Sequence, residues 1–159
     1  MDNISRIRGE LADIWIPSIY QTKIRSQRTR KFSLDIPEKE NQPSVLYTLL
    51  GFELKVGNRR FASPDLATAR YLLIFARLGC REFAVPYDIT VISPAADELE
   101  TAWQHMLLKV ESTMKGFSPQ VRGRTKAGMI RQIRAEIASI GAGELMPLFD
   151  RPTRQRPKG

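Results

Sequence analysis

The clearest structural signal in the sequence is the stretch FELKVGNRRFAS, residues 52–63. Its apolar residues alternate with charged ones up to a central Gly-Asn pair, which is typical of a two-residue β-turn, and a second run follows. We therefore expect a β-hairpin over residues 45–63. The register of this turn predicts two cross-strand pairs: Leu54 with Phe61 on the buried side and Lys55 with Arg60 on the outer side.

On both sides of this hairpin the sequence predicts helices and two further strands. Period-two patterns predict strands over residues 32–36 and 81–92, and Pro86 makes the second one an edge strand or a bulged strand. Residues 65–78 predict a helix that is apolar nearly all round and therefore buried. This order predicts an α+β domain. We expect a small, mostly antiparallel sheet over about residues 32–92, with helices packed on one face, one N-terminal helix and two C-terminal helices.

Prolines and small polar residues mark the expected helix boundaries. Apolar spacing predicts an N-terminal helix with Asn3 as its N-cap, which Pro17 ends or kinks before a second short helix. Three Ser-Pro pairs can each provide a serine N-cap and a proline in the first helical turn. The pairs are Ser63-Pro64, Ser93-Pro94 and Ser118-Pro119. We expect the basic, glycine-interrupted residues 120–128 to form a loop-like segment before the final helix.

Length and composition narrow the class of protein. The 159 residues predict one domain over residues 1–149, followed by a polar basic tail, residues 150–159, that we expect to be disordered. Cys80 is the only cysteine, which excludes an internal disulfide and a multi-thiolate metal site and fits a reducing compartment. No apolar run is long enough to span a bilayer, and the charges near the N-terminus are unlike a signal peptide. We therefore expect a cytoplasmic protein that needs no metal or cofactor.

Positive charge lies at both ends of the sequence. Lys and Arg number 25 against 17 Asp and Glu, a formal net charge of +8. Residues 1–31 carry seven basic and three acidic side chains, and residues 101–159 carry eleven and four. Two stretches, residues 22–31 and 112–135, contain cations and no acid. Such cations replace condensed counterions along nucleic-acid phosphates, which makes these residues candidates for binding nucleic acid: Lys23, Arg25, Arg28, Arg30, Lys31, Arg122, Arg124, Lys126, Arg131 and Arg134.

Within the second stretch, residues 122–128 read RGRTKAG and alternate cations with small residues. The small residues allow a phosphate to approach the backbone closely, and an adjoining helix N-terminus attracts anions. A flexible inter-helix loop without any ligand explains the same residues as well. We expect alanine at Arg122, Arg124 and Lys126 to weaken polyanion binding and to leave thermal stability unchanged, because loop side chains contribute little packing.

One pattern has catalytic character: Glu53-Leu54-Lys55 with Asp35 upstream. Side chains at i and i+2 on a strand share a face, so a neighbouring aspartate could complete a carboxylate pair for Mg²⁺, with Lys55 near the attacked phosphate. These residues resemble the Asp…Glu-x-Lys core of the PD-(D/E)xK nucleases, a resemblance that implies metal-dependent nuclease activity. Unlike that family's pattern, no proline precedes Asp35, and a hairpin strand follows Lys55 where a helix is expected. Glu-x-Lys triplets are common on solvated strand faces, which explains these residues without any catalytic role.

No other residue predicts a reaction. His105, the only histidine, projects away from the apolar stripe of its helix, so we expect it in solvent. Cys80 lies at a helix–strand junction, where a buried or half-buried thiol is expected. Neither G-x-G-x-x-G nor G-x-x-x-x-G-K-[ST] occurs, so these nucleotide-binding loops are excluded.

Several functions therefore compete. The charge distribution favours a non-enzymatic nucleic-acid-binding or ribonucleoprotein-associated module. The first alternative is an adaptor or assembly factor that binds an acidic partner protein, and the second is a metal-dependent nuclease. Attraction of the cationic ends to anionic membranes is a further alternative.

Overall fold

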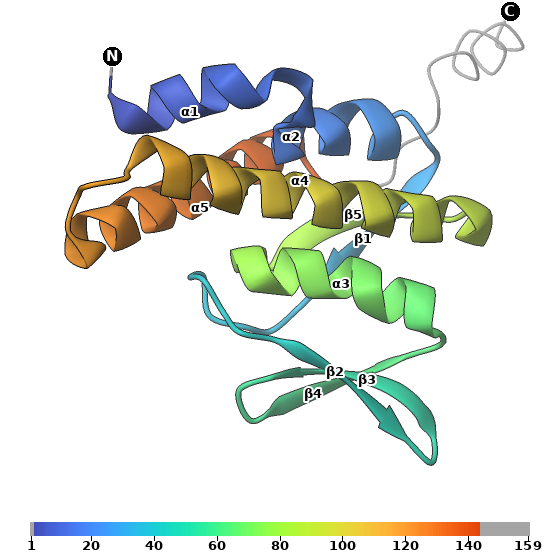
Figure 1. Ribbon diagram of the computed structural model, residues 1–159. Helices are drawn as coiled ribbons and strands as arrows, with labels where there is room; N and C mark the ends of the chain where they lie inside the picture. Colours follow the sequence, from blue (N-terminus) through green and yellow to red (C-terminus); the bar gives the residue numbers. More distant parts are fainter. Residues whose placement is uncertain (1, 144–159) are drawn as a thin grey trace, which may run out of the picture.

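A computed structural model describes residues 2–143 of the chain (Figure 1). Helix α3 (Leu66–Leu78) lies between two small antiparallel sheets, one of three strands and one of two. The remaining helices lie on the side of the two-stranded sheet, and the three-stranded sheet forms the opposite end of the molecule (Figure 1). The predicted α+β class is confirmed, and its strands are divided between these two sheets.

The predicted hairpin is the second half of a three-stranded meander. Its strands pair in sequence order: β2 (Ser44–Thr48), β3 (Gly51–Val56) and β4 (Arg59–Ser63). The register contains both predicted pairs, Leu54 with Phe61 and Lys55 with Arg60. Leu54 is fully buried, because this face of β3 packs against α3. The period-two pattern therefore predicted both the pairing and the buried face correctly.

The second sheet contains two antiparallel strands, β1 (Thr29–Ser33) and β5 (Glu82–Pro86). The strand predicted over residues 32–36 begins earlier, at Thr29. The strand predicted over residues 81–92 is wrong beyond Pro86, because a 3-10 turn, Ile89–Val91, follows and leads directly into a helix. The apolar alternation after Pro86 thus belongs to turn and helix residues.

Aspartate, rather than the predicted serine, caps α3. The Asp65 carboxylate accepts a hydrogen bond from the Thr68 N–H at 2.7 Å, whereas the Ser63 hydroxyl donates to the Asp65 carbonyl at 3.0 Å. Gly79 ends α3 as predicted, with a φ of +78° in the left-handed region. A side chain at Gly79 would also collide with the Lys39 backbone, 2.2 Å from the ideal Cβ position. This glycine lets the loop before β2 pack against the end of α3.

The two long helices are α4 (Ile92–Thr113) and α5 (Pro119–Ile140). Ser93 is not an N-cap, because α4 has already begun at Ile92 and places Pro94 inside its first turn, where a missing N–H breaks no helical bond. Ser118 does cap α5, since its hydroxyl accepts a hydrogen bond from the Val121 N–H at 3.2 Å. Of the three Ser-Pro pairs, only the last therefore provides the predicted serine N-cap.

The N-terminal segment consists of short helical pieces. They are α1 (Asn3–Leu11), a 3-10 turn (Ala12–Ile14), α2 (Ile16–Ile19) and a π-helical turn (Tyr20–Ile24). Asp2, not Asn3, caps α1, and its carboxylate accepts a hydrogen bond from the Ser5 N–H at 2.7 Å. The prediction that Pro17 ends or kinks the first helix is wrong. That helix ends earlier, at Ala12 with φ +52°, and Pro17 lies in the first turn of α2.

Two tyrosine hydroxyls bind the edge of β5 that faces away from β1. The Tyr20 hydroxyl accepts a hydrogen bond from the Ala84 N–H at 2.8 Å and donates one to the Gly141 carbonyl at 2.7 Å. The Tyr71 hydroxyl donates to the Ala84 carbonyl at 2.6 Å. Both tyrosines are fully buried, and this burial raises the pKa of Tyr20 to about 12 and that of Tyr71 well above its ordinary value. The hydroxyls thus take the place of a third strand.

One hydrophobic cluster runs from Ile7 in α1 to Ile137 in α5. Its aromatic centre includes Phe75 of α3, whose ring stacks on that of Phe83 of β5 at 4.2 Å between centroids. Within residues 2–143, no helix combines the length and the apolar character needed to cross a membrane. The tail predicted over residues 150–159 lies outside the described residues.

Candidate nucleic-acid interface

The basic residues 120–128 are helical, which corrects the prediction of a loop-like segment. Ser118 and Pro119 start α5 upstream of these residues, and the glycines do not interrupt it. Gly128 faces inward, where an ideal Cβ would lie 2.6 Å from the side chain of Ile4. This glycine allows α1 to approach α5 closely, so its small size serves packing and leaves the neighbouring cations on a rigid support.

The outer side of this helix carries arginines separated by small residues. We call it the α5 basic face; its members are all exposed: Gln120, Gly123, Arg124, Ala127 and Arg131. Arg124 and Arg131 are seven residues apart, which places them on the same side of the helix at a separation of roughly 10 Å along its axis. Within residues 2–143, neither side chain makes an ion pair or a hydrogen bond. Both guanidinium groups are therefore available to an external anion.

Two neighbouring cations are engaged within the protein. The Lys126 ammonium lies 2.9 Å from the Glu40 carboxylate, and the Arg122 guanidinium donates to the Phe117 carbonyl at 3.1 Å. The contact with Glu40 joins α5 to the loop that precedes β2. Alanine at Lys126 or Arg122 would thus remove contacts within the fold. The expectation of unchanged thermal stability assumed loop side chains without such contacts, so it does not apply to these two residues.

Two further candidates hold the fold together. The Arg134 guanidinium donates to the Leu78 carbonyl at the end of α3, at 2.8 Å. Arg25 donates to the Thr29 hydroxyl at 2.9 Å and to the Gly143 carbonyl at 2.7 Å. The Leu78 carbonyl belongs to the last turn of α3, which carries partial negative charge. The guanidinium groups of both arginines are committed to the protein's own backbone.

The remaining candidates lie on the π-helical turn, on β1 and between them. Lys23 is exposed, and Lys31 forms an exposed ion pair with Glu82 at 3.8 Å. Arg28 stacks over the Tyr87 ring, and Arg30 over the Phe32 ring, at 4.7 and 5.7 Å from the centroids. Arg25 places this region beside the C-terminal end of α5, whereas the α5 basic face lies toward the helix's N-terminal end. The structure therefore places the two acid-free stretches in different regions.

The three residues of the nuclease-like pattern lie on two different segments. Glu53 and Lys55 share the outer face of β3, as their spacing predicts, and Glu53 pairs with Arg60 at 3.3 Å. Asp35 lies in the segment after β1, where it forms ion pairs with Arg59 and Arg81. Within residues 2–143, no group of three or more histidine, cysteine, aspartate or glutamate side chains is arranged to hold a metal ion. Each carboxylate thus has an arginine as its partner.

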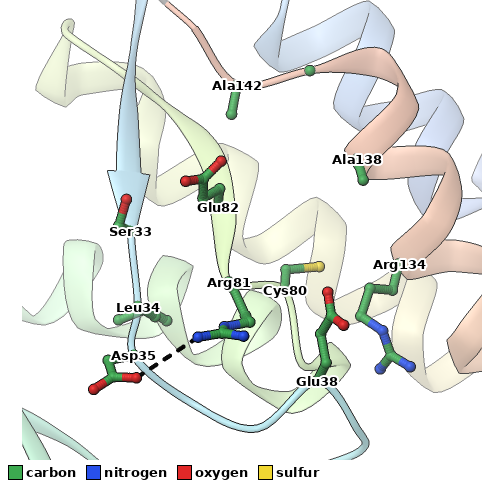
Figure 2. A pocket seen from close by; sticks show the side chains of 11 residues that line it. Ser33, Leu34, Asp35, Glu38, Cys80, Arg81, Glu82, Arg134, Ala138 and Ala142 are labelled. Carbon is green, nitrogen blue, oxygen red and sulfur yellow. Dashed lines mark ion pairs between the residues drawn. The ribbon is translucent and has the colours of Figure 1, made fainter.

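A pocket of about 550 Å³ lies where β1, β5 and the end of α5 meet (Figure 2). Figure 2 shows Asp35 and Arg81 paired at one side of this pocket, with Glu38, Cys80 and Arg134 grouped nearby. Burial raises the pKa of the Cys80 thiol to about 12, so the thiol stays protonated and is a poor nucleophile. Cys80 is buried and His105 is exposed, as predicted.

No motif in the sequence predicted this pocket. Its lining comes from segments far apart in the chain, around residues 33–38, 80–82 and 134–142. Its charged groups have both signs, and Arg134 is already bound to a backbone carbonyl. The pocket therefore has no dominant charge with which to select an anion, in contrast to the α5 basic face.

Comparisons with protein-family models, with curated proteins and with solved structures find no match to this chain.

Proposed function

We propose that the protein is a non-enzymatic module that binds nucleic acid through the α5 basic face. The observation that carries this proposal is the pair Arg124 and Arg131, exposed on one side of a rigid helix with no partner within residues 2–143. Exposed cations that are not engaged by carboxylates are the ones able to replace counterions along a phosphate backbone. The other cations of residues 112–135 that have partners contribute less.

The small residues of this face support a backbone-contacting mode. Ala127 leaves the helix surface low between the two arginines, and Gly123 does the same beside Arg124, so a phosphate chain can approach the helix where the guanidinium groups contact it. The separation of roughly 10 Å spans about three phosphates of one strand, at about 3.4 Å of rise each. This arrangement recognises the charge and the spacing of the phosphates, and it does not by itself select a base sequence.

The experiment measures binding of fluorescein-labelled 20-mers (single-stranded RNA, double-stranded RNA and double-stranded DNA) by anisotropy over a series of salt concentrations. The variant is Arg124→Ala/Arg131→Ala. The matched control is Lys55→Ala/Arg60→Ala, which removes two cations from the outer face of the three-stranded sheet. For duplex DNA, we expect the slope of log K against log salt to fall by about 1.8 in the α5 variant, since each phosphate contact contributes about 0.9.

The control variant should keep the slope and the affinity of the native protein. Equal slopes for the native protein and the α5 variant would contradict the proposed site, and absence of binding to all three probes at 50 mM salt would contradict the function. Poly-L-glutamate of similar length serves as a competitor. If it displaces the nucleic acid at equal charge concentration, the alternative of an acidic partner protein is favoured instead.

A further inference from the structure

Strand β2 forms an open edge of the three-stranded sheet. It pairs with β3 on one side only, and within residues 2–143 no backbone hydrogen bond is made on its other side. Thr48 and Gly51 flank the two-residue turn, so the outward-facing N–H and C=O groups on this edge belong to Val45 and Tyr47. Unpaired strand edges of this kind are templates for a further strand.

Apolar residues extend this edge into solvent. Leu49 and Leu50 form the β2–β3 turn and are 105% and 97% exposed, and Tyr47 is 83% exposed. The Thr48 hydroxyl accepts a hydrogen bond from the Leu50 N–H at 3.2 Å and donates to the Gly51 carbonyl at 3.0 Å, which holds the leucines outward. Two-residue turns favour Asn and Gly at these positions, so turn geometry does not account for two leucines.

The two edges of the sheet differ in how they resist pairing. β4, the other edge strand, begins with Arg59 and Arg60, and charged side chains on an edge discourage the addition of a strand. β2 reads SVLYT and has no charge, no proline and no bulge in its register. Only β2 therefore lacks the features that keep an edge strand apart from others.

We propose that a second copy of this chain occupies the edge, with the two β2 strands antiparallel about a two-fold axis at Leu46. The strand is complementary to itself in this register. Ser44 lies opposite Thr48 of the other copy, Val45 opposite Tyr47, and Leu46 opposite Leu46. These are a hydroxyl pair, a β-branched–aromatic pair and an apolar pair, all of them favourable neighbours across antiparallel strands.

The backbone fits the same register. The N–H and C=O groups of Val45 and Tyr47 face outward from the edge. In this register Val45 of each copy lies opposite Tyr47 of the other, and each of these two pairs makes two backbone hydrogen bonds, four in all. The uncharged edge also avoids the repulsion that two molecules of net charge +8 experience elsewhere on their surfaces. The same register places Leu49 of each copy opposite Pro43 of the other, so part of the exposed turn is covered.

Helix packing permits the six-stranded sheet that results. In each copy α3 lies over the central strand β3, and the two α3 helices then share one face of the sheet. Three strand spacings separate β3 from its counterpart, about 14 Å at about 4.8 Å each. Packed helices need about 8–10 Å, so the helices do not collide and the two exposed Tyr47 side chains lie in the space between them.

The test measures the mass of the full chain by sedimentation equilibrium over a concentration series. We expect the native protein to shift from 18.1 kDa toward twice that mass. Leu46→Lys and Leu46→Glu each place two like charges opposite one another at the two-fold axis, so each variant alone should dimerise at least about tenfold more weakly. An equal mixture of the two variants should dimerise again, because opposite charges then meet.

Ala62→Lys and Ala62→Glu are the matched controls. Ala62 lies opposite Glu53 on β4, just as Leu46 does on β2, so each control adds the same charge at the mirror position of the sheet. The controls should dimerise like the native protein. Amide exchange of Val45 and Tyr47 in the native protein should slow as concentration rises, a readout that needs no variant.

A native protein that stays monomeric up to about 1 mM, near the weak limit for a specific complex, overturns the proposal. A dimer that survives both Leu46 substitutions shows that a different surface is used. Failure of the mixture to restore the dimer overturns the Leu46-on-Leu46 register.

Discussion

Replacing Tyr20 with phenylalanine tests the hydroxyl arrangement at the edge of β5. The substitution keeps the ring in the core and removes the partner of the buried Ala84 N–H, together with the hydrogen bond to the Gly141 carbonyl. A buried donor left without a partner costs about 1–3 kcal/mol, and the lost hydrogen bond adds about 0.5–1.5 kcal/mol. Because Gly141 is half-buried and water can replace part of its bond, we expect a total of about 2–3 kcal/mol.

The assay is urea unfolding followed by far-ultraviolet circular dichroism, with thermal unfolding beside it. For a chain of this length each kcal/mol lowers Tm by about 2–4 °C, so Tyr20→Phe should lower Tm by about 4–12 °C. Tyr71→Phe frees only the Ala84 carbonyl and should cost about 1–3 kcal/mol. Since both hydroxyls bind the backbone of one residue, Ala84, the double variant should deviate from additivity by at least about 0.5 kcal/mol.

Tyr47→Phe is the control, because that side chain is 83% exposed. It should change the free energy of unfolding by less than about 0.5 kcal/mol. A native-like stability of Tyr20→Phe, within the same margin, would refute the argument that this hydroxyl replaces a missing strand. Equal losses for Tyr20→Phe and Tyr47→Phe would refute it too.

Three further outcomes follow from the contacts described. Burial alone would raise the pKa of Glu136, but hydrogen bonds, above all from the Trp15 indole, lower it below its ordinary value of 4.5. The charged Glu136 carboxylate therefore stabilises the folded state fully above that pH, and this stabilisation is lost as the pH falls through the lowered pKa. Urea titrations should therefore show a smaller loss between pH 7 and about 3 for Glu136→Gln than for the native protein. Burial raises the pKa values of Cys80 and Tyr20 to about 12, from ordinary values of 9.0 and 10.0. The two protonated groups therefore contribute fully to the free energy of unfolding below about pH 9, and this contribution is lost as the pH rises toward about 12. Tyr20→Phe should accordingly lose stability less steeply over this alkaline range, and a steeper loss would contradict the assignment. The purified protein should cleave neither plasmid DNA nor a structured RNA with Mg²⁺ or Mn²⁺; cleavage that Glu53→Ala abolishes would restore the nuclease interpretation.

Local patterns predicted those parts of the fold that depend on neighbouring residues. The β3–β4 register followed from a Gly-Asn turn between alternating strands, and the end of α3 at Gly79 followed from a conformation that glycine adopts easily. The errors came where two local signals competed. Asp65 lies two residues beyond Ser63 and caps α3 in its place, and Pro86 ends a strand within a continuous alternating pattern.

The candidate site was predicted less completely, for a different reason. The sequence identified cations but not their partners, because the partners lie far along the chain. Lys126 pairs with Glu40, and Arg134 binds the carbonyl of Leu78. Only the folded chain separates these engaged side chains from Arg124 and Arg131. The helicity of residues 120–128 was not predicted either, because Gly123 and Gly128 favour a loop, whereas the N-cap at Ser118 starts α5 before them.

The sequence by itself determined the α+β class, the positive charge toward both ends of the chain, and the turn that aligns β3 with β4. These properties depend on composition or on contacts within a few residues, and such contacts form in the same way in any compact fold. The tertiary structure decided that β1 pairs with β5, that tyrosine hydroxyls bind the outer edge of β5, and that β2 is left with an open edge. The first two outcomes join residues that are far apart in the sequence, such as Thr29 with Pro86 and Tyr20 with Ala84, and the third depends on which elements pack beside β2, so no local preference of the chain selects them.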